Sequence, residues 1–99
     1  FISTHIVNLL NLPMELLSCA MDITTPLGTM REKGLRSPAC VFSLSDVDHA
    51  WSFLVLDMKS FDVIFGMDWL IANKARIDCY LRRVYLTTLS GVPLVFQGE

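Results

Sequence analysis

The chain has 99 residues, of which 53% are hydrophobic and 18% are charged, and its formal net charge is -2. That length fits one small domain with a single core, and the apolar content excludes a disordered chain. The slightly acidic balance offers no basic surface to a polyanion, so we expect no direct nucleic-acid binding. No uncharged apolar stretch approaches the ~18 residues of a membrane-spanning helix, so we expect no membrane segment.

Cysteine and histidine usage gives no support for a metal site. Cys19, Cys40 and Cys79 are odd in number and widely spaced, which predicts neither a disulfide framework nor a zinc half-site. We expect free thiols, and hence a reducing, intracellular location. The acidic run from Asp46 to His49 is more simply a solvated turn than a metal cluster, and we expect no cofactor.

A short helix is predicted close to the first residue. Either Ser3 or Thr4 can act as its N-cap, and Pro13 would end it. Apolar residues at i, i+3 and i+4 fall on one face of this helix: Ile6, Leu9 and Leu10.

The next segment predicts a strand that leads into a hairpin. Residues 16–23 lack helical periodicity, and Pro26, Leu27 and Gly28 then provide a turn signal. The mixed charges of Arg31, Glu32, Lys33 and Arg36 predict a solvated loop after the hairpin.

Residues 40–96 are predicted to form short strands and one more helix. Residues 40–45 alternate with period two, Asp46 to His49 is a polar turn, and Met67 to Ala72 suits a short helix. The remaining β-prone segments are 51–56, 61–65, 77–80, 84–89 and 94–96. About seven strands with two short helices predict a mainly β fold, an antiparallel barrel or sandwich.

Three consecutive segments carry a family resemblance. They are Phe53-Leu54-Val55-Leu56-Asp57-Met58, Phe61-Asp62-Val63-Ile64-Phe65-Gly66-Met67-Asp68-Trp69-Leu70 and Ala75-Arg76-Ile77-Asp78-Cys79. Together they resemble the retropepsin-like aspartic protease domain of plant gypsy-type retrotransposon polyproteins. The resemblance implies a closed barrel of short antiparallel strands that works as a homodimer. It also implies a strand-glycine-helix motif at Ile64, Phe65 and Gly66, where the strand passes beside the active-site loop.

The same resemblance implies that the catalytic aspartate is missing. Phe1-Ile2-Ser3 resembles the sequence that follows the family's Asp-Ser/Thr-Gly-Ala-x-His motif, so the catalytic Asp would precede Phe1. Retropepsins need two carboxylates that share one proton, one from each subunit. We therefore expect residues 1–99 to be a single retropepsin-like domain without its N-terminal catalytic segment, and no catalytic residue within it. It would bind and cut a peptide substrate only if that segment were restored.

No other acidic residue is a good replacement for the missing aspartate. Asp22-Ile23-Thr24 lacks the small residue and the glycine of the motif, and the others lie at predicted strand ends or a helix start. These others are Asp57, Asp62, Asp68 and Asp78. The resemblance places a flap at Pro26, Leu27 and Gly28, although a plain surface hairpin explains the same residues.

Three interpretations of the function stay open. The chain is an endopeptidase fragment, a noncatalytic module for dimerisation or peptide binding, or a relic without function. For the fold, we expect four residues around Gly66 to be buried: Ile64, Trp69, Leu70 and Ile77.

Overall fold

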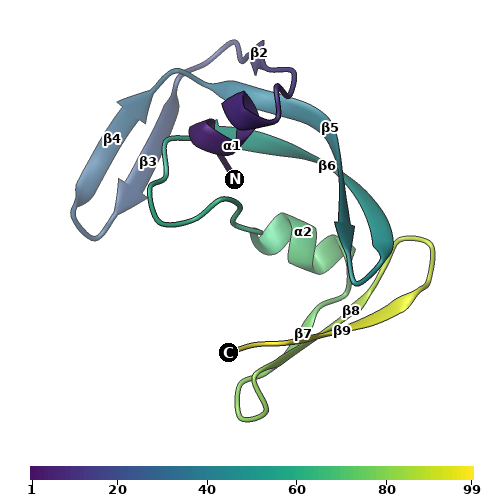
Figure 1. The fold of residues 1–99 in the computed structure, drawn as a ribbon. Helices are drawn as coiled ribbons and strands as arrows, with labels where there is room; N and C mark the ends of the chain where they lie inside the picture. The colour runs from purple at the N-terminus through teal and green to yellow at the C-terminus, as the bar shows by residue number, and fades with distance from the viewer. The chain divides into compact units, whose positions relative to one another are not determined.

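The computed structural model describes all residues from Phe1 to Glu99 (Figure 1). It is 48% strand and 12% helix, which confirms the prediction of a mainly β fold with two short helices. The strands hydrogen-bond into three sheets, and a single closed barrel stays a prediction. None of its helices has the length and apolar character to cross a bilayer.

Backbone contacts divide the chain into two compact units. Unit 1 consists of Phe1–Val41 and Ala50–Ile64. Unit 2 consists of Phe42–His49 and Phe65–Glu99. Each unit is therefore built from two separate stretches of sequence.

The main sheet has four strands in the order β1-β6-β5-β2. β1 (Ile2–Ser3) lies parallel to β6 (Val47–Leu56), and β2 (Glu15–Leu16) lies antiparallel to β5 (Leu35–Leu44). The core of unit 1 consists of its buried apolar side chains: Ile2, Val7, Cys40, Phe53 and Val55.

The turn between β5 and β6 is shorter than the sequence predicted. Only Ser45 and Asp46 form it, both with positive φ (49° and 63°), and β6 already begins at Val47. His49 is therefore a buried strand residue and not part of a solvated turn, so that prediction was wrong. The tight turn needs a left-handed conformation at both positions, which Asp46 tolerates better than most residues.

The helix α1 (Thr4–Leu9) begins where it was predicted. Ser3 is the N-cap, and its Oγ accepts a hydrogen bond of 3.1 Å from the backbone N of Ile6. The apolar face given by the spacing is only partly covered, because Ile6 is half-buried and Leu9 and Leu10 are exposed, while Val7 is the buried residue. α1 directly follows the buried Ser3, so the residue one turn later, Val7, is the one that returns to the core side.

The hairpin consists of β3 (Met21–Thr25) and β4 (Gly28–Glu32), joined by a turn at Pro26 and Leu27. The charged run that was predicted to form a loop lies mostly in strands, with Arg31 in β4 and Arg36 in β5. Arg31 is paired across the hairpin with Asp22, and Arg36 is paired with Glu15 of β2. These cross-strand pairs explain why a mixed-charge segment is extended instead of looped.

Unit 2 contains a three-stranded antiparallel sheet in the order β7-β8-β9. Its strands are β7 (Arg76–Asp78), β8 (Arg83–Thr87) and β9 (Pro93–Gln97). Because residues that face each other across the ladder share a face, the register gives one apolar face: Ile77, Val84, Leu86, Leu94 and Phe96.

The helix α2 (Met67–Ala72) follows Gly66, as predicted. Trp69 is its buried residue, with 3% of its surface exposed. The helix ends at Asn73, whose side-chain Nδ2 donates to the carbonyl oxygen of Trp69 at 2.9 Å. The backbone N of Thr87 donates to the carbonyl oxygen of Asn73 at 2.8 Å, which ties the end of α2 to β8.

The burial predictions around Gly66 were correct only in part. Trp69 is buried and Leu70 is half-buried, but Ile64 is 39% exposed and Ile77 is 61% exposed. Ile77 lies on β7, an edge strand, which leaves its side chain uncovered on one side. The strand predicted for residues 61–65 is reduced to one isolated bridge between Val63 and Ile2, and Ile64 pairs only with the first residue of the chain, so its side chain is left partly uncovered.

Candidate functional site

The first residues of the chain are held by backbone hydrogen bonds to residues 62–64. The terminal amino group of Phe1 donates to the carbonyl oxygen of Ile64 at 2.6 Å, and the backbone N of Ile64 donates back to Phe1 at 2.8 Å. The next residue, Ile2, forms an antiparallel bridge with Val63, and the backbone N of Ser3 donates to the backbone carbonyl oxygen of Asp62 at 2.8 Å. Ile2 and Ser3 are almost completely buried, so the path of the chain start is firmly fixed.

Gly66 is the N-cap residue of α2. Its φ of −85° and ψ of 179° are open to any residue, so the backbone does not require glycine for its conformation. A Cβ at this position would lie 2.9 Å from Oδ1 of Asp68, and no other segment comes within 4 Å of it. The exposed Asp68 carboxylate stands in the first helical turn, where the helix dipole favours a negative charge.

The β3–β4 hairpin has one apolar and one polar face. In the register, Ile23 lies opposite Met30, while Thr24 lies opposite Thr29 with their hydroxyl oxygens 3.1 Å apart. Neighbouring positions alternate between the two faces, so Met21 and the Glu32 opposite it lie on the same face as Ile23 and Met30, which is apolar in its middle and ends in a charged residue at the base of the hairpin. Met30 is 54% exposed, and the apolar face is therefore open to a partner.

The three residues assigned to a flap by resemblance lie at the tip of this hairpin. Pro26 and Leu27 form the turn, Gly28 opens β4 with a φ of 131°, and the Leu27 side chain is fully exposed. The hydroxyl of Thr25 accepts from the backbone N of Leu27 and donates to the carbonyl of Gly28, both at 3.2 Å. The tip is thus a well-formed turn that presents an apolar side chain to solvent.

The carboxylates have separate partners and lie on different elements. Asp22 accepts from Nε of Arg31 at 2.9 Å, and Oδ1 of Asp78 accepts from the backbone N of Leu81 at 3.0 Å. No hydrogen bond joins two carboxyl groups, which is the contact that a proton-sharing pair needs. The other acidic residues that the sequence offered as replacements are exposed: Asp57, Asp62 and Asp68.

A set of four aromatic rings occupies unit 2. His49 stacks on Phe42 with a centroid distance of 5.4 Å, and Phe65 stacks on Trp69 at 4.0 Å. The set is completed by Phe42 with Phe65 at 5.6 Å and His49 with Trp69 at 5.9 Å. Nε2 of His49 is buried in this cluster without a hydrogen-bond partner.

The place of His49 in this cluster has a signal in the sequence. Every second residue of β6 from His49 to Val55 points to the same face, and three of these four residues are buried. The period-two pattern from Phe53 and Val55 back to His49 is therefore the signal that His49 is a strand residue. No three His, Cys, Asp or Glu side chains come together as metal ligands, and Asp46 and Asp48 beside His49 are exposed.

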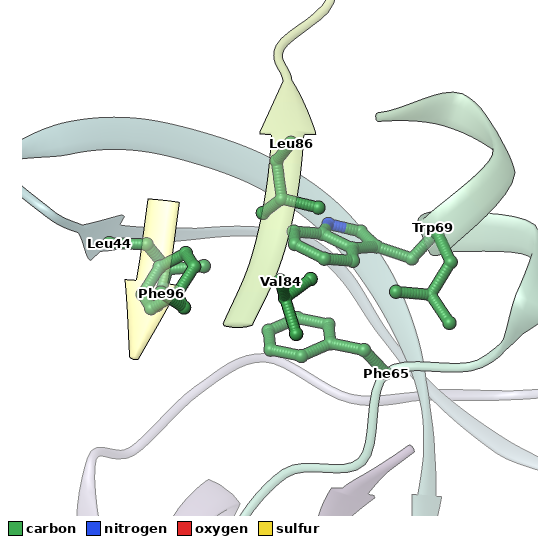
Figure 2. A pocket seen from close by; sticks show the side chains of 7 residues that line it. Leu44, Phe65, Trp69, Val84, Leu86 and Phe96 are labelled. Atoms are coloured by element: carbon green, nitrogen blue, oxygen red, sulfur yellow. The ribbon is translucent and has the colours of Figure 1, made fainter. Parts of the chain in front are cut away.

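An apolar cavity of about 310 Å³ lies over the apolar face of the β7-β8-β9 sheet. Figure 2 shows the side chains of Val84 and Leu86 projecting from β8 toward the rings of Phe65 and Trp69. Its lining comes from the β5 end, the turn before α2, α2 itself, β8 and β9: Leu44, Phe65, Trp69, Leu70, Val84, Leu86 and Phe96. All of these side chains are aliphatic or aromatic.

The structure is that of a small, mainly β chain with two short helices. The family described as retroviral aspartyl protease matches residues 1–91. The chain therefore belongs to the retroviral aspartyl protease family. No curated protein and no solved structure matches the chain.

Proposed function

We propose that this chain is the body of an aspartic endopeptidase from the polyprotein of a plant gypsy-type retrotransposon. In this proposal the catalytic Asp-Ser/Thr-Gly motif belongs to residues that precede Phe1 in the parent polypeptide, and residues 1–99 alone are inactive. Membership of the retroviral aspartyl protease family supports the endopeptidase class. The gypsy-type and plant origin rests on the resemblance of residues 53–79.

The observation that carries the proposal is the pairing of Phe1 with Ile64. Both of its backbone hydrogen bonds follow the antiparallel register set by Ile2 and Val63. A preceding residue that continued this register would lie opposite Phe65, and the one before it opposite Gly66. The upstream motif would thus run beside Ile64, Phe65 and Gly66, which is where the family places the active-site loop.

The amphipathic hairpin supports the assignment of Pro26, Leu27 and Gly28 as the tip of a flap. A flap needs one face that can close on a peptide and one face that tolerates water. The Ile23 and Met30 pair supplies the first face, and the Thr24 and Thr29 pair supplies the second. An isolated two-stranded hairpin of this kind is marginally stable, which suits a segment that opens and closes.

A homodimer is part of the proposal, because each retropepsin subunit contributes one of the two aspartates that share a proton. The exposed apolar residues of the chain agree with such an interface, for example Met67 and Ile71, one turn apart on α2 and both more than 60% exposed. Sedimentation velocity across a wide concentration range tests the dimer. A strict monomer of the extended chain at all concentrations would count against it.

The decisive experiment compares three purified proteins on a peptide library. They are the 99-residue chain, the chain extended by Asp-Ser-Gly-Ala-Thr-His-Ser before Phe1, and the same extension with Asn in place of the added Asp. We expect cleavage only by the second, strongest in mildly acidic solution where one of two adjacent carboxylates holds a proton, and blocked by an aspartic-protease transition-state analogue. Cleavage by the unextended chain would overturn the assignment and redirect the search to Asp22, Asp57, Asp62 and Asp68.

The flap can be tested in the same active, extended protein. Met30→Ser alters the apolar face, whereas Thr29→Ser alters the polar face one residue away. We expect Met30→Ser to lower kcat/KM at least tenfold and Thr29→Ser to change it less than twofold. Equal effects would remove the flap assignment while leaving the endopeptidase proposal intact.

The alternative is a noncatalytic peptide-binding module. It is favoured by one observation: the hairpin and its apolar face are complete in a chain whose carboxylates form no pair. Under this alternative the 99-residue chain would bind extended apolar peptides, and Met30→Ser in that chain would weaken the binding. The extended chain would cleave no peptide.

A further inference from the structure

Glu32 is the one charged side chain on the apolar face of the β3–β4 hairpin. It lies opposite Met21 at the base of the hairpin, and the next pair on the same face is Ile23 with Met30. Two residues of a strand span about 7 Å, so the positions of Met30 and Glu32 are separated by that distance along β4. The face therefore has apolar side chains in its middle and a negative charge at its end.

The neighbouring carboxylates are already paired, whereas that of Glu32 is not. Asp22 accepts a hydrogen bond from Arg31 on the polar face of the hairpin. Glu15 of β2 is paired with Arg36 of β5. Glu32 forms no ion pair and no side-chain hydrogen bond, so no other side chain of the protein compensates its charge.

The face that bears Glu32 is also the face that is partly shielded from water. Only three residues of the two strands are half-buried, and all of them lie on this face: Met21, Ile23 and Glu32. The polar face is exposed, including Thr24 and Thr29. Water and salt screen an ion pair less at a half-buried position than at an exposed one. Glu32 is therefore better placed than a fully exposed acid to attract a cation.

We propose that Glu32 selects peptides that have a basic side chain close to an apolar one. The inference rests on the proposed function, because it takes the apolar face of the hairpin as the surface that closes on a peptide. The substrate class is an extended peptide that packs an apolar side chain against Ile23 and Met30 and brings a lysine or arginine to Glu32.

The two kinds of contact fit an extended peptide. Side chains on one side of an extended peptide recur about every 7 Å, which matches the spacing of Met30 and Glu32. The stems of lysine and arginine are apolar, so the stem packs on Met21 while the charged group reaches the carboxylate. Ammonium and guanidinium groups donate charge-assisted hydrogen bonds to a carboxylate, and these are stronger than hydrogen bonds between neutral groups. An acidic side chain at the same place is repelled.

The test compares peptides that differ at one position. The probe is a peptide of alternating leucine and serine, in which Lys, Met or Glu replaces each residue in turn. Met has an unbranched side chain like that of Lys but no charge. Fluorescence anisotropy measures binding to the inactive extended chain, with Asn in place of the added Asp, so that no probe is cut. At one position we expect Lys to bind at least fivefold more tightly than Met, and Glu to bind more weakly than either.

Two matched variants assign the preference to one carboxylate. Glu32→Gln removes the charge on the apolar face, and Asp22→Asn makes the same change on the polar face. We expect Glu32→Gln to reduce the preference for Lys over Met to less than twofold, whereas Asp22→Asn leaves it at least fivefold. Glu32→Lys should reverse the preference, so that the Glu peptide binds more tightly than the Lys peptide.

Three outcomes would overturn the role of Glu32. They are equal affinity for the Lys and Met peptides at every position, a Lys preference that Glu32→Gln leaves unchanged, and no binding of any probe. The endopeptidase assignment is judged separately, by cleavage of the peptide library by the active extended chain. A chain that cuts peptides without any preference for Lys would keep that assignment and refute this inference alone.

Discussion

His49 provides the sharpest test of the packing in unit 2. Only 9% of its surface is exposed, its ring contacts those of Phe42 and Trp69, and its Nε2 has no hydrogen-bond partner. Replacing it by Phe keeps a flat ring at the same place and removes the unpaired nitrogen. We therefore expect His49→Phe to raise the free energy of unfolding.

The magnitude follows from the cost of an unsatisfied buried polar group. Such a group costs about 1–3 kcal/mol of desolvation, which the substitution recovers. Phe is slightly larger than His, and a small overpacking penalty offsets part of this gain. The expected net stabilisation is about 1 kcal/mol, which corresponds to a rise in Tm of roughly 4–8 °C for a domain of this size.

Urea unfolding followed by circular dichroism measures the effect, and His5 supplies the control. His5 is the other histidine and lies exposed on α1, so His5→Phe should change the free energy of unfolding by less than about 0.5 kcal/mol. Destabilisation by His49→Phe of more than about 1 kcal/mol would refute the reasoning, because it would show that Nε2 has a stabilising partner.

Three further predictions concern stability, each measured by the shift of the urea midpoint at constant m-value. Ser3→Ala removes the hydroxyl that accepts from Ile6 and should cost about 1 kcal/mol, and a neutral result would show that the cap is redundant. Leu86→Ala opens space in the floor of the cavity and should cost about 3 kcal/mol, whereas a loss below about 1 kcal/mol would mean that the site collapses freely. Asp22→Asn breaks the exposed pair with Arg31 and should cost less than about 0.5 kcal/mol, and a larger loss would imply that the hairpin stabilises the rest of the chain.

Local signals in the sequence predicted elements well where one residue type determines the structure. Ser3, one of the two residues predicted as the cap, is the N-cap of α1, and the apolar run after Gly66 forms α2 from Met67 to Ala72. The turn at Pro26 and Leu27 also lies where the Pro and Gly spacing placed it. Caps and tight turns depend on neighbours within four residues, which the sequence shows directly.

Burial was harder to predict because it depends on distant partners. The apolar Ile77 is exposed since β7 is an edge strand, and Leu9 and Leu10 lie outside the core since α1 starts from a buried Ser3. His49 was assigned to a turn although it continues the alternation of β6. The cavity could not be predicted, because its lining comes from three separate stretches of sequence, at residue 44, residues 65–70 and residues 84–96.

The division of the chain has a consequence for how the protein can be cut or expressed in parts. The polypeptide passes between the two units at residues 41–42, 49–50 and 64–65, so neither unit is a continuous fragment. A shortened chain that began at Phe65 would lose the β5–β6 tip, and with it Leu44 of the cavity rim and His49 of the ring cluster. A protease that cut the turn at Ser45 and Asp46 would cleave residues 42–49, the first of the two stretches that form unit 2. Both units therefore contain parts of β5 and β6. Unit 2 folds only when residues 42–49 meet partners at least sixteen positions later in the chain, such as Phe65 for Phe42.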